Sequence, residues 1–248
     1  MTRVISILTA AYRPVPEYLH AAYESILSQE IPDEWTWQWV VQEDGQTGEV
    51  ANLLPSDYRI SAGSNRRGGE CVTRTMCLSR AMGDFVKVLD ADDMLTPGTL
   101  ARDIAVLTRN PDIGWTTSRV LDLMPDGSKA GFDLDPPEGR LPRGSVLAHW
   151  RTHDYRAPVH PATLCMRRSL AIALGGWMAL PASSDTGLLM AADALSDGYF
   201  SASTGLLYRK WPGQATSQPA HTDPTERNAR MRLIEDRANA LRALSNNA

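Results

Sequence analysis

The first 110 residues alternate short apolar runs of strand length with segments whose apolar residues recur at helical spacing. The strand-like runs are "RVISILTA" from Arg3, "WTWQWVVQ" from Trp35 and "FVKVLD" from Phe85. Residues 16–28 and 70–82, which lie between these runs, place apolar side chains on one face of a helix. Strands that alternate with helices of this length require right-handed crossovers and a mainly parallel sheet covered on both faces. The pattern therefore predicts an α/β fold with a Rossmann-like central sheet.

Two helix boundaries follow from capping chemistry. The helix over residues 70–82 is expected to end at Gly83, because glycine tolerates the left-handed conformation that follows many helices. The next helix is expected to start with Thr96 as its N-cap and Pro97 as its first residue, and to end before Pro111.

The second half of the chain is less regular and predicts a smaller antiparallel region. "IGWTTSRVLDLMPDGSKAG" suggests two strands around an Asp126-Gly127 turn. Residues 130–145 and 212–224 are expected to be surface loops, since both are rich in turn residues. No repeat or change of composition divides the chain. We expect one domain, residues 1–248, whose parts are residues 1–110, 111–224 and a C-terminal helix over 225–248.

Composition excludes several functional classes. The 248 residues carry a net charge of -4, which is not the basic footprint of a nucleic-acid-binding protein. No apolar run approaches the ~18 residues of a membrane span, and the opening strand is too short for a signal peptide. These features predict a soluble, cytoplasmic protein. Three cysteines without metal-type spacing are expected to be free thiols that fill the core.

Polar clusters follow three of the predicted strands, at Thr9–Arg13, Glu43–Gly45 and Asp90–Asp93. Ligands of open parallel sheets bind beyond the carboxyl ends of the strands. A single aspartate there would suggest a helix cap, but "DADD" is followed by Thr96, which is better placed to cap. Neighbouring carboxylates repel each other, and a hard divalent cation removes that repulsion. Because Mg²⁺ or Mn²⁺ keeps positions open for phosphate oxygens, the cluster predicts a metal ion that holds a diphosphate.

Five segments in matching order and spacing resemble the family 2 glycosyltransferases of the GT-A fold. They are "SILTAAYRPVPEYLHAAYESILSQ", "VVQEDGQTG", "NRRGGECVTRTMCLSRAMGDFVKVLDADD", "HPATLCMRRSLAIALGGW" and "LPASSD". The resemblance implies a nucleotide-diphospho-sugar donor with Mn²⁺ or Mg²⁺. We take UDP as the default nucleotide, and dTDP and GDP stay open. It also implies transfer of the sugar with inversion to an acceptor hydroxyl. Carbohydrate, lipid-linked and small natural-product acceptors stay open, and a lipid-linked acceptor would place the protein at a membrane surface.

The resemblance also implies roles for individual residues. Asp92 matches the metal ligand and Asp185 the general base. The positions that match the nucleotide site are Thr9, Ala11, Tyr12, Glu43, Asp44, Arg74, Asp90 and Ala91. From the residues alone, Arg74 either extends to the surface or pairs with a buried anion, because it lies in an apolar helical row. Asp185 opens a predicted helix, so capping is its alternative role.

The chain departs from the family pattern at three positions. The Glu-Asp pair of many relatives is Ser184-Asp185 here, which leaves one carboxylate. Gln46 replaces the serine that ends the acidic turn of the family. Trp211 occupies a position where many relatives carry a histidine that helps to hold the metal or the diphosphate. Either the protein lacks this ligand or His221 supplies it.

Other residues are candidates for contact with the acceptor or with the diphosphate. Trp177 could stack on an acceptor ring, and His160 could touch substrate or have a structural role. Arg209 and Lys210 either face the diphosphate or form a solvated strand end. The Gln-X-X-Arg-Trp signature of processive synthases is absent, which favours addition of one sugar.

Two other functional classes compete with sugar transfer. A non-catalytic, transferase-like module would explain the departures at Gln46, Ser184 and Trp211. A sugar nucleotidyltransferase would need a glycine-rich basic loop after the first strand, and "TAAYRPVPEYL" has no such loop.

Overall fold

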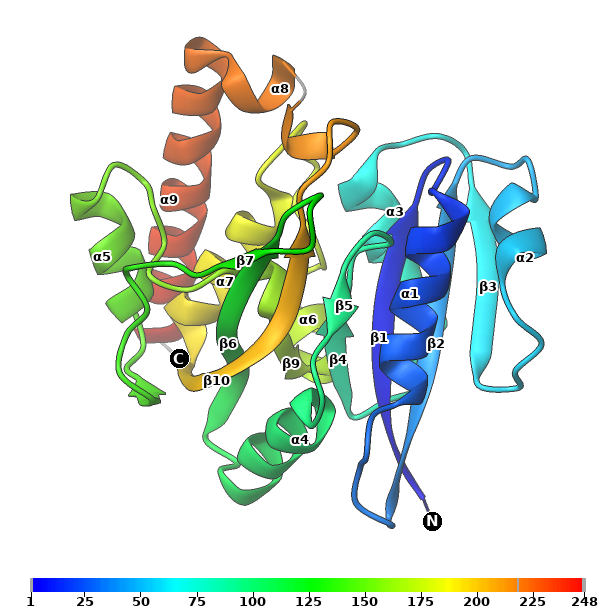
Figure 1. Ribbon diagram of the computed structural model, residues 1–248. Helices are drawn as coiled ribbons and strands as arrows, with labels where there is room; N and C mark the ends of the chain where they lie inside the picture. Colours follow the sequence, from blue (N-terminus) through cyan, green and yellow to red (C-terminus); the bar gives the residue numbers. More distant parts are fainter. Residues whose placement is uncertain (1, 218, 247–248) are drawn as a thin grey trace.

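The computed structural model describes residues 2–217 and 219–246. In this part of the chain, one ten-stranded sheet has the order β3-β2-β1-β4-β9-β6-β10-β5, with β7 beside β6 and β8 beside β10 (Figure 1). The strands are β1 (Arg3–Ala11), β2 (Trp35–Asp44), β3 (Ile60–Asn65), β4 (Phe85–Val88), β5 (Met94–Leu95), β6 (Ile113–Leu123), β7 (Lys129–Ala130), β8 (Gly139–Leu141), β9 (Cys165–Arg167) and β10 (Asp197–Arg209).

The sheet is parallel in its first half and mixed in its second. β3, β2, β1 and β4 are parallel neighbours, as the alternating pattern predicts. β9 is antiparallel to both β4 and β6, and so connects the first half of the sheet to the parallel pair β6 and β10. β6 and β7 form the predicted hairpin. The expected α/β class with a smaller antiparallel region is confirmed.

Helices cover both faces of this sheet (Figure 1). They are α1 (Pro16–Leu27), α2 (Glu49–Leu53), α3 (Glu70–Cys77), α4 (Thr99–Arg109), α5 (Ser145–Thr152), α6 (Arg168–Ala173), α7 (Ser184–Leu195), α8 (Pro219–Thr222) and α9 (Pro224–Asn246), with short 3₁₀ turns η1 (Pro161–Thr163) and η2 (Ala215–Ser217). Apolar side chains of α1, α2 and α4 pack on one face of the sheet. Those of α3, α5, α6, α7 and α9 pack on the other face.

The core follows the sequence pattern closely. Trp35, Trp37 and Trp39 alternate along β2 and are buried in the same cluster as the apolar face of α1. Helix α7 is buried on almost every side, because it lies between the sheet and α9. The three cysteines are buried free thiols, as expected. Among the described residues, no helix combines the length and apolarity needed to cross a bilayer.

Gly83 does not end a helix, and this prediction is wrong. Helix α3 ends at Cys77, and Gly83 lies just before β4. A Cβ atom at this position would be 2.6 Å from the Ser6 nitrogen and 2.8 Å from the Val4 oxygen. Glycine is required here because β1 passes too close for any side chain.

Thr96 does not cap α4. That helix begins at Thr99, after Gly98 in a left-handed conformation with φ 74°. The Thr96 hydroxyl instead donates a hydrogen bond to the Thr204 oxygen on β10. The two predicted loops are also more regular than expected, since residues 130–145 contain β8 and residues 212–224 contain η2 and α8.

Candidate active site

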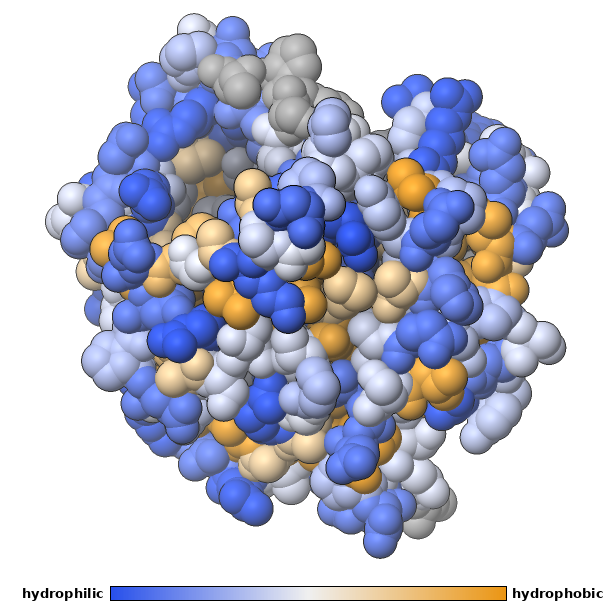
Figure 2. Space-filling view, viewed as in Figure 1, coloured by the Kyte–Doolittle hydropathy of each residue, from blue (hydrophilic) through white to orange (hydrophobic). Residues whose placement is uncertain are grey.

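A cleft of about 660 Å³ lies at the carboxyl ends of β1, β2 and β4. Its size is typical of a small-molecule site. In Figure 1 these strand ends point to the upper edge of the molecule, and Figure 2 shows that the surface is indented at this edge. The predicted residues that line the cleft are Ala11, Tyr12, Asp44, Arg74, Asp90, Ala91, Asp92, His160 and Asp185. The sheet therefore brings acids from three distant segments to one place, as expected from their positions after strands.

Arg74 is the centre of this site. Its guanidinium is 1% exposed and bonds three carboxylates. Nη1 donates to Asp185 Oδ1 at 2.5 Å and lies 2.6 Å from Glu70 Oε1, while Nη2 donates to Asp90. Desolvation alone would lower the pKa of Arg74, but the three acids outweigh it and hold the pKa well above its usual value. Of the two alternatives for Arg74, it pairs with carboxylates and does not extend to the surface, and Arg74 stays a cation.

Asp185 is held on one edge and open on the other. It lies in the first turn of α7, where the N-cap position is Ser183, so the capping alternative for Asp185 is wrong. Trp177 donates its indole N–H to Asp185 Oδ1 at 2.6 Å, beside the bond from Arg74. The carboxylate keeps 20% of its side chain exposed in the cleft. Asp185 thus has a fixed orientation and a free edge for a ligand.

Trp177 itself cannot stack on an acceptor ring. Its side chain is only 5% exposed, and it packs in the core cluster beneath α7. The prediction of an acceptor platform is therefore wrong. The residue orients Asp185 through its N–H, because a buried indole nitrogen needs an acceptor.

Asp92 and Trp211 are hydrogen-bonded to each other. The Trp211 indole N–H donates to Asp92 Oδ2 at 2.6 Å, and its ring meets Tyr18 edge-on at 5.5 Å. Within residues 2–217 and 219–246, no three acids, histidines or cysteines are grouped to hold a cation. His221 lines the cleft without completing such a group. A hard divalent cation fits here only if Asp92 is joined by oxygens of a ligand, which is how Mg²⁺ is commonly held.

Other members of the acidic segment have separate environments. Removal from water is the largest cause that raises the pKa of Asp90, to about 6, against the lowering effect of Arg74. Asp93 is fully buried and accepts the backbone N–H of Arg209 at 2.8 Å. Burial raises the pKa of Asp93 well above its usual range. Asp93 is therefore a structural acid, whereas Asp90 and Asp92 face the cleft.

Two predicted nucleotide residues do not reach the cleft. Thr9 is fully buried, and its hydroxyl donates to the Leu89 oxygen at 2.7 Å and accepts from the Trp39 indole at 2.9 Å. The Glu43 carboxylate accepts hydrogen bonds from Thr47 and Gly48. Burial alone would raise the pKa of Glu43, but these bonds outweigh it and lower the pKa. Both side chains stabilise the loops and strands beneath the site, so their placement in the nucleotide pocket is wrong.

Asp44 lines the cleft and also organises its rim. The carboxylate accepts the backbone N–H groups of Gly68, at 2.7 Å, and Gly69, at 3.1 Å. It also accepts the Thr73 hydroxyl at 3.0 Å. Because these bonds fix the loop that leads into α3, Asp44 determines the shape of one wall of the cleft.

Arg209 does not face the cleft, contrary to the prediction. Its guanidinium stacks on Tyr18 at 4.2 Å, and Nε donates to the Asp92 oxygen at 2.8 Å. Lys210 lies 3.3 Å from Asp122. Arg209 thus supports the backbone of Asp92, Lys210 pairs with a carboxylate on β6, and neither side chain is among those that line the cleft.

His160 lines the cleft as a neutral side chain. Burial is the largest cause that lowers the pKa of His160, to about 4. Nδ1 accepts the Ala162 N–H at 3.3 Å, so the ring caps the η1 turn. This is the structural role that the sequence left open, and contact with substrate stays a prediction.

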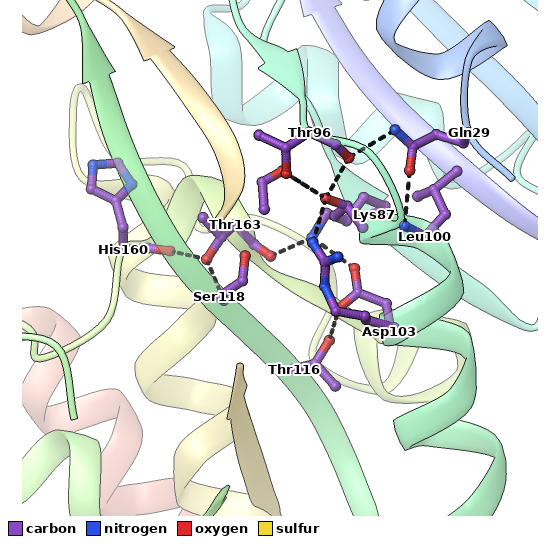
Figure 3. Close-up of polar contacts among 12 residues, drawn as sticks. Gln29, Lys87, Thr96, Leu100, Asp103, Thr116, Ser118, His160 and Thr163 are labelled. Carbon is purple, nitrogen blue, oxygen red and sulfur yellow. Dashed lines mark hydrogen bonds and ion pairs between the residues drawn. The ribbon is translucent and has the colours of Figure 1, made fainter. Parts of the chain in front are cut away.

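A buried ion pair supports the turn that carries His160 (Figure 3). Lys87, fully buried on β4, donates to Asp103 Oδ2 at 2.8 Å and to the Thr163 oxygen at 2.6 Å. The Thr163 hydroxyl donates to the His160 oxygen at 2.8 Å, and Thr116 donates to the other oxygen of Asp103 at 2.6 Å. This network joins β4, α4, β6 and η1 directly beneath the cleft.

Several residues that line the cleft were given no individual role from the sequence, among them Glu70, Arg13 and Ser183. Glu70 could have been found, since it precedes Arg74 by one helical turn and opposite charges at that spacing pair. Arg13 and Ser183 line the cleft with positive φ, 44° and 63°. Arg13 belongs to the polar cluster expected after the first strand, but neither residue type favours a positive φ, so the sequence did not indicate this conformation.

Comparisons with known proteins agree with this geometry. The family model of Glycosyl transferase family 2 matches residues 6–170. An uncharacterized glycosyltransferase of Methanocaldococcus jannaschii is 25% identical over 116 residues, which cover 44% of this chain and 39% of that protein. The chain thus spans well under half the length of this relative.

Solved structures of S. aureus TarS, residues 1–349, show a similar fold. The complex with UDP-GlcNAc superposes with a TM-score of 0.71 at 18% identity, covering 98% of this chain and 71% of that one. The same protein without ligand superposes with a TM-score of 0.67 at 17% identity, covering 98% of this chain and 70% of that one. The likeness establishes the GT-A fold. From the match over residues 6–170 and this fold, the chain belongs to the family 2 glycosyltransferases.

Proposed function

We propose that the protein transfers one sugar from a UDP-sugar to an acceptor hydroxyl with inversion, and that it requires Mn²⁺ or Mg²⁺. The observation that carries this proposal is that Asp44, Asp92 and Asp185 line one cleft. UDP is favoured because structures of the similar S. aureus TarS contain UDP-GlcNAc or UDP. Residues 1–110 would form the nucleotide-binding half and residues 111–224 the acceptor side of this single domain. A cytoplasmic location stays a prediction.

Each residue contributes a separate part of the reaction. The nucleoside would lie along Ala11, Tyr12, Asp44 and Ala91, on the side of the cleft formed by β1, β2 and the segment after β4. Asp92 would hold the divalent cation together with diphosphate oxygens. The bound cation would neutralise charge on the departing diphosphate.

Asp185 would act as the base. The acceptor oxygen bonds to the anomeric carbon as the carbon–oxygen bond to the diphosphate breaks, and the hydroxyl proton passes to Asp185. A carboxylate at hydrogen-bond distance can remove this proton in the transition state. Arg74 and Trp177 occupy one oxygen of Asp185 and so aim the other edge at the cleft. Attack opposite the leaving group inverts the anomeric centre.

The test separates binding from turnover. UDP binding is measured by calorimetry with and without Mn²⁺, and release of UDP from a panel of UDP-sugars is followed with candidate acceptors. We expect Asp92→Asn to lose the Mn²⁺-dependent part of UDP binding. Asp185→Asn should bind UDP within about twofold of the wild type but lose at least about 100-fold in kcat, the scale of general-base catalysis.

Other results point to the competing classes. Metal-dependent UDP binding without turnover of any sugar would indicate a non-catalytic module. Release of pyrophosphate in place of UDP would indicate nucleotidyl transfer. Failure of every UDP-sugar to bind or to raise Tm would refute the proposal, because a ligand of the native state must stabilise it.

A further inference from the structure

Three carboxylates share the single cation at the centre of the cleft. Glu70, Asp90 and Asp185 all bond the guanidinium of Arg74, and all four side chains line the cleft. Within 4 Å of these three acids, the described residues place no other lysine or arginine. Three ionised acids around one cation repel each other, so the cluster favours retaining a proton.

Glu70 is the member placed to hold that proton. It is the first residue of α3, after Gly69 with φ 84°, and 43% of its side chain is exposed in the cleft. Its Oε1 and the Oδ1 of Asp185 lie 2.6 and 2.5 Å from the same nitrogen, Nη1 of Arg74. The side chains of Glu70 and Asp185 are hydrogen-bonded to each other, and a hydrogen bond between two carboxyl groups requires that one of them holds a proton.

We propose that Glu70 is a positioning residue of this site, which carries a proton and donates it in a hydrogen bond to Asp185. The inference rests on the proposed function, because it concerns the orientation of the base. The neutral acid relieves repulsion on Arg74 and leaves the negative charge on Asp185. Asp185, which then accepts from Glu70, Arg74 and Trp177, can present only its free edge to an acceptor hydroxyl.

The charges around Glu70 agree with this assignment. The groups that act on it are Arg74 of its own helix, Asp185 of α7 and Asp90 from the segment after β4. Arg74 lowers the pKa of Glu70, but partial removal from water, the two acids and the hydrogen bond with Asp185 together raise it to about 8. The raised pKa favours the protonated form of Glu70 at neutral pH.

The pH profile of turnover distinguishes positioning from a merely structural role. Wild-type kcat should fall above about pH 8, where ionised Glu70 repels Asp185 and turns it from the acceptor. Glu70→Gln should keep at least a third of the kcat at pH 7 and lose the alkaline fall, because its amide donates at every pH. Glu70→Ala should lose about tenfold in kcat across the range, the scale of an outer-shell residue, with the donor KM within twofold.

A second measurement does not depend on turnover. In protein labelled with ¹³C at the glutamate carboxyls, the resonance that Glu70→Gln removes should titrate near pH 8. Asp185→Asn should lower that midpoint, since the negative neighbour is lost. Glu49→Gln is the matched control, because Glu49 is also the exposed first residue of a helix after a left-handed glycine. It should change neither the profile nor this resonance.

The inference about Glu70 and the proposed function can be refuted independently of each other. A resonance that titrates near the ordinary glutamate value, or an alkaline fall that persists in Glu70→Gln, would overturn the inference while leaving sugar transfer intact. If no sugar is transferred at all, the proposed function fails, and the titration midpoint alone decides whether Glu70 holds the proton.

Discussion

Replacing Lys87 with methionine should destabilise the fold strongly. Lys87 is fully buried in the middle of the sheet, and its ammonium group donates to Asp103 and to the Thr163 oxygen (Figure 3). Methionine keeps most of the side-chain volume but removes the charge. Asp103, which is 5% exposed, would then be a buried carboxylate without a cation, although Thr116 still donates to it.

The expected loss follows from this geometry. Removing one partner of a buried ion pair costs about 3–5 kcal/mol, because the remaining charge stays desolvated. For a domain of this size, 1 kcal/mol shifts Tm by about 2–4 °C, so Tm should fall by about 6–20 °C. We expect a loss in the upper half of this free-energy range, because the Thr163 oxygen also loses its hydrogen-bond donor.

Urea unfolding at pH 7.5 measures the loss directly. Lys129→Met serves as the control, because Lys129 is exposed on a strand, and it should stay within about 0.5 kcal/mol of the wild type. The double variant Lys87→Met with Asp103→Leu should recover at least half of the loss, since an apolar pair can replace a buried ion pair. A single-variant loss below about 1 kcal/mol, or a double variant as unstable as the sum of both singles, would refute the argument.

Three further variants test other parts of the structure. Gly83→Ala should lower the free energy of unfolding by at least about 2 kcal/mol in urea titrations, because its Cβ would contact the Ser6 nitrogen. Trp211→Phe removes the N–H that Asp92 accepts and should weaken Mn²⁺ binding in the presence of UDP by about 10-fold, measured by EPR; unchanged affinity would refute that role. The depressed pKa of His160 means that stability falls as pH drops from 6.5 towards 4, by up to about 3 kcal/mol, because the unfolded chain binds the proton first. His160→Asn should flatten this dependence when Tm is compared at pH 5 and 7.5.

The order of elements was predictable because it depends on hydrophobic periodicity. The runs from Arg3, Trp35 and Phe85 became buried strands, and the apolar stripe at the C-terminus became α9. Such patterns reflect burial, which the sequence encodes residue by residue. Helix ends were less predictable. Thr96 has the chemistry of an N-cap, but a hydrogen bond to β10 uses its hydroxyl, and only the tertiary structure provides that partner.

The site residues show which further information was missing. Glu43 and Asp44 were both expected in the cleft, yet successive residues of a strand face opposite sides, so one of them had to turn away. The sequence does not say which one, because that depends on where β2 ends relative to β3. Thr9 was placed in the cleft because it matches a loop position of the family, but it lies two residues inside β1 and its hydroxyl meets Trp39 instead.

The fold holds three acids of the cleft close together, although they repel one another. Arg74 connects α3 to α7 and to the segment after β4, so the same contacts that hold the two halves together also crowd three carboxylates around one charge. Repulsion among them raises the pKa of Glu70 and adds to the burial that raises that of Asp90, and a raised pKa reduces stability as the pH increases. A divalent cation held beside Asp92 would offset part of this repulsion. The extra stabilisation that Mn²⁺ adds to that of UDP alone should therefore be larger at pH 8 than at pH 5.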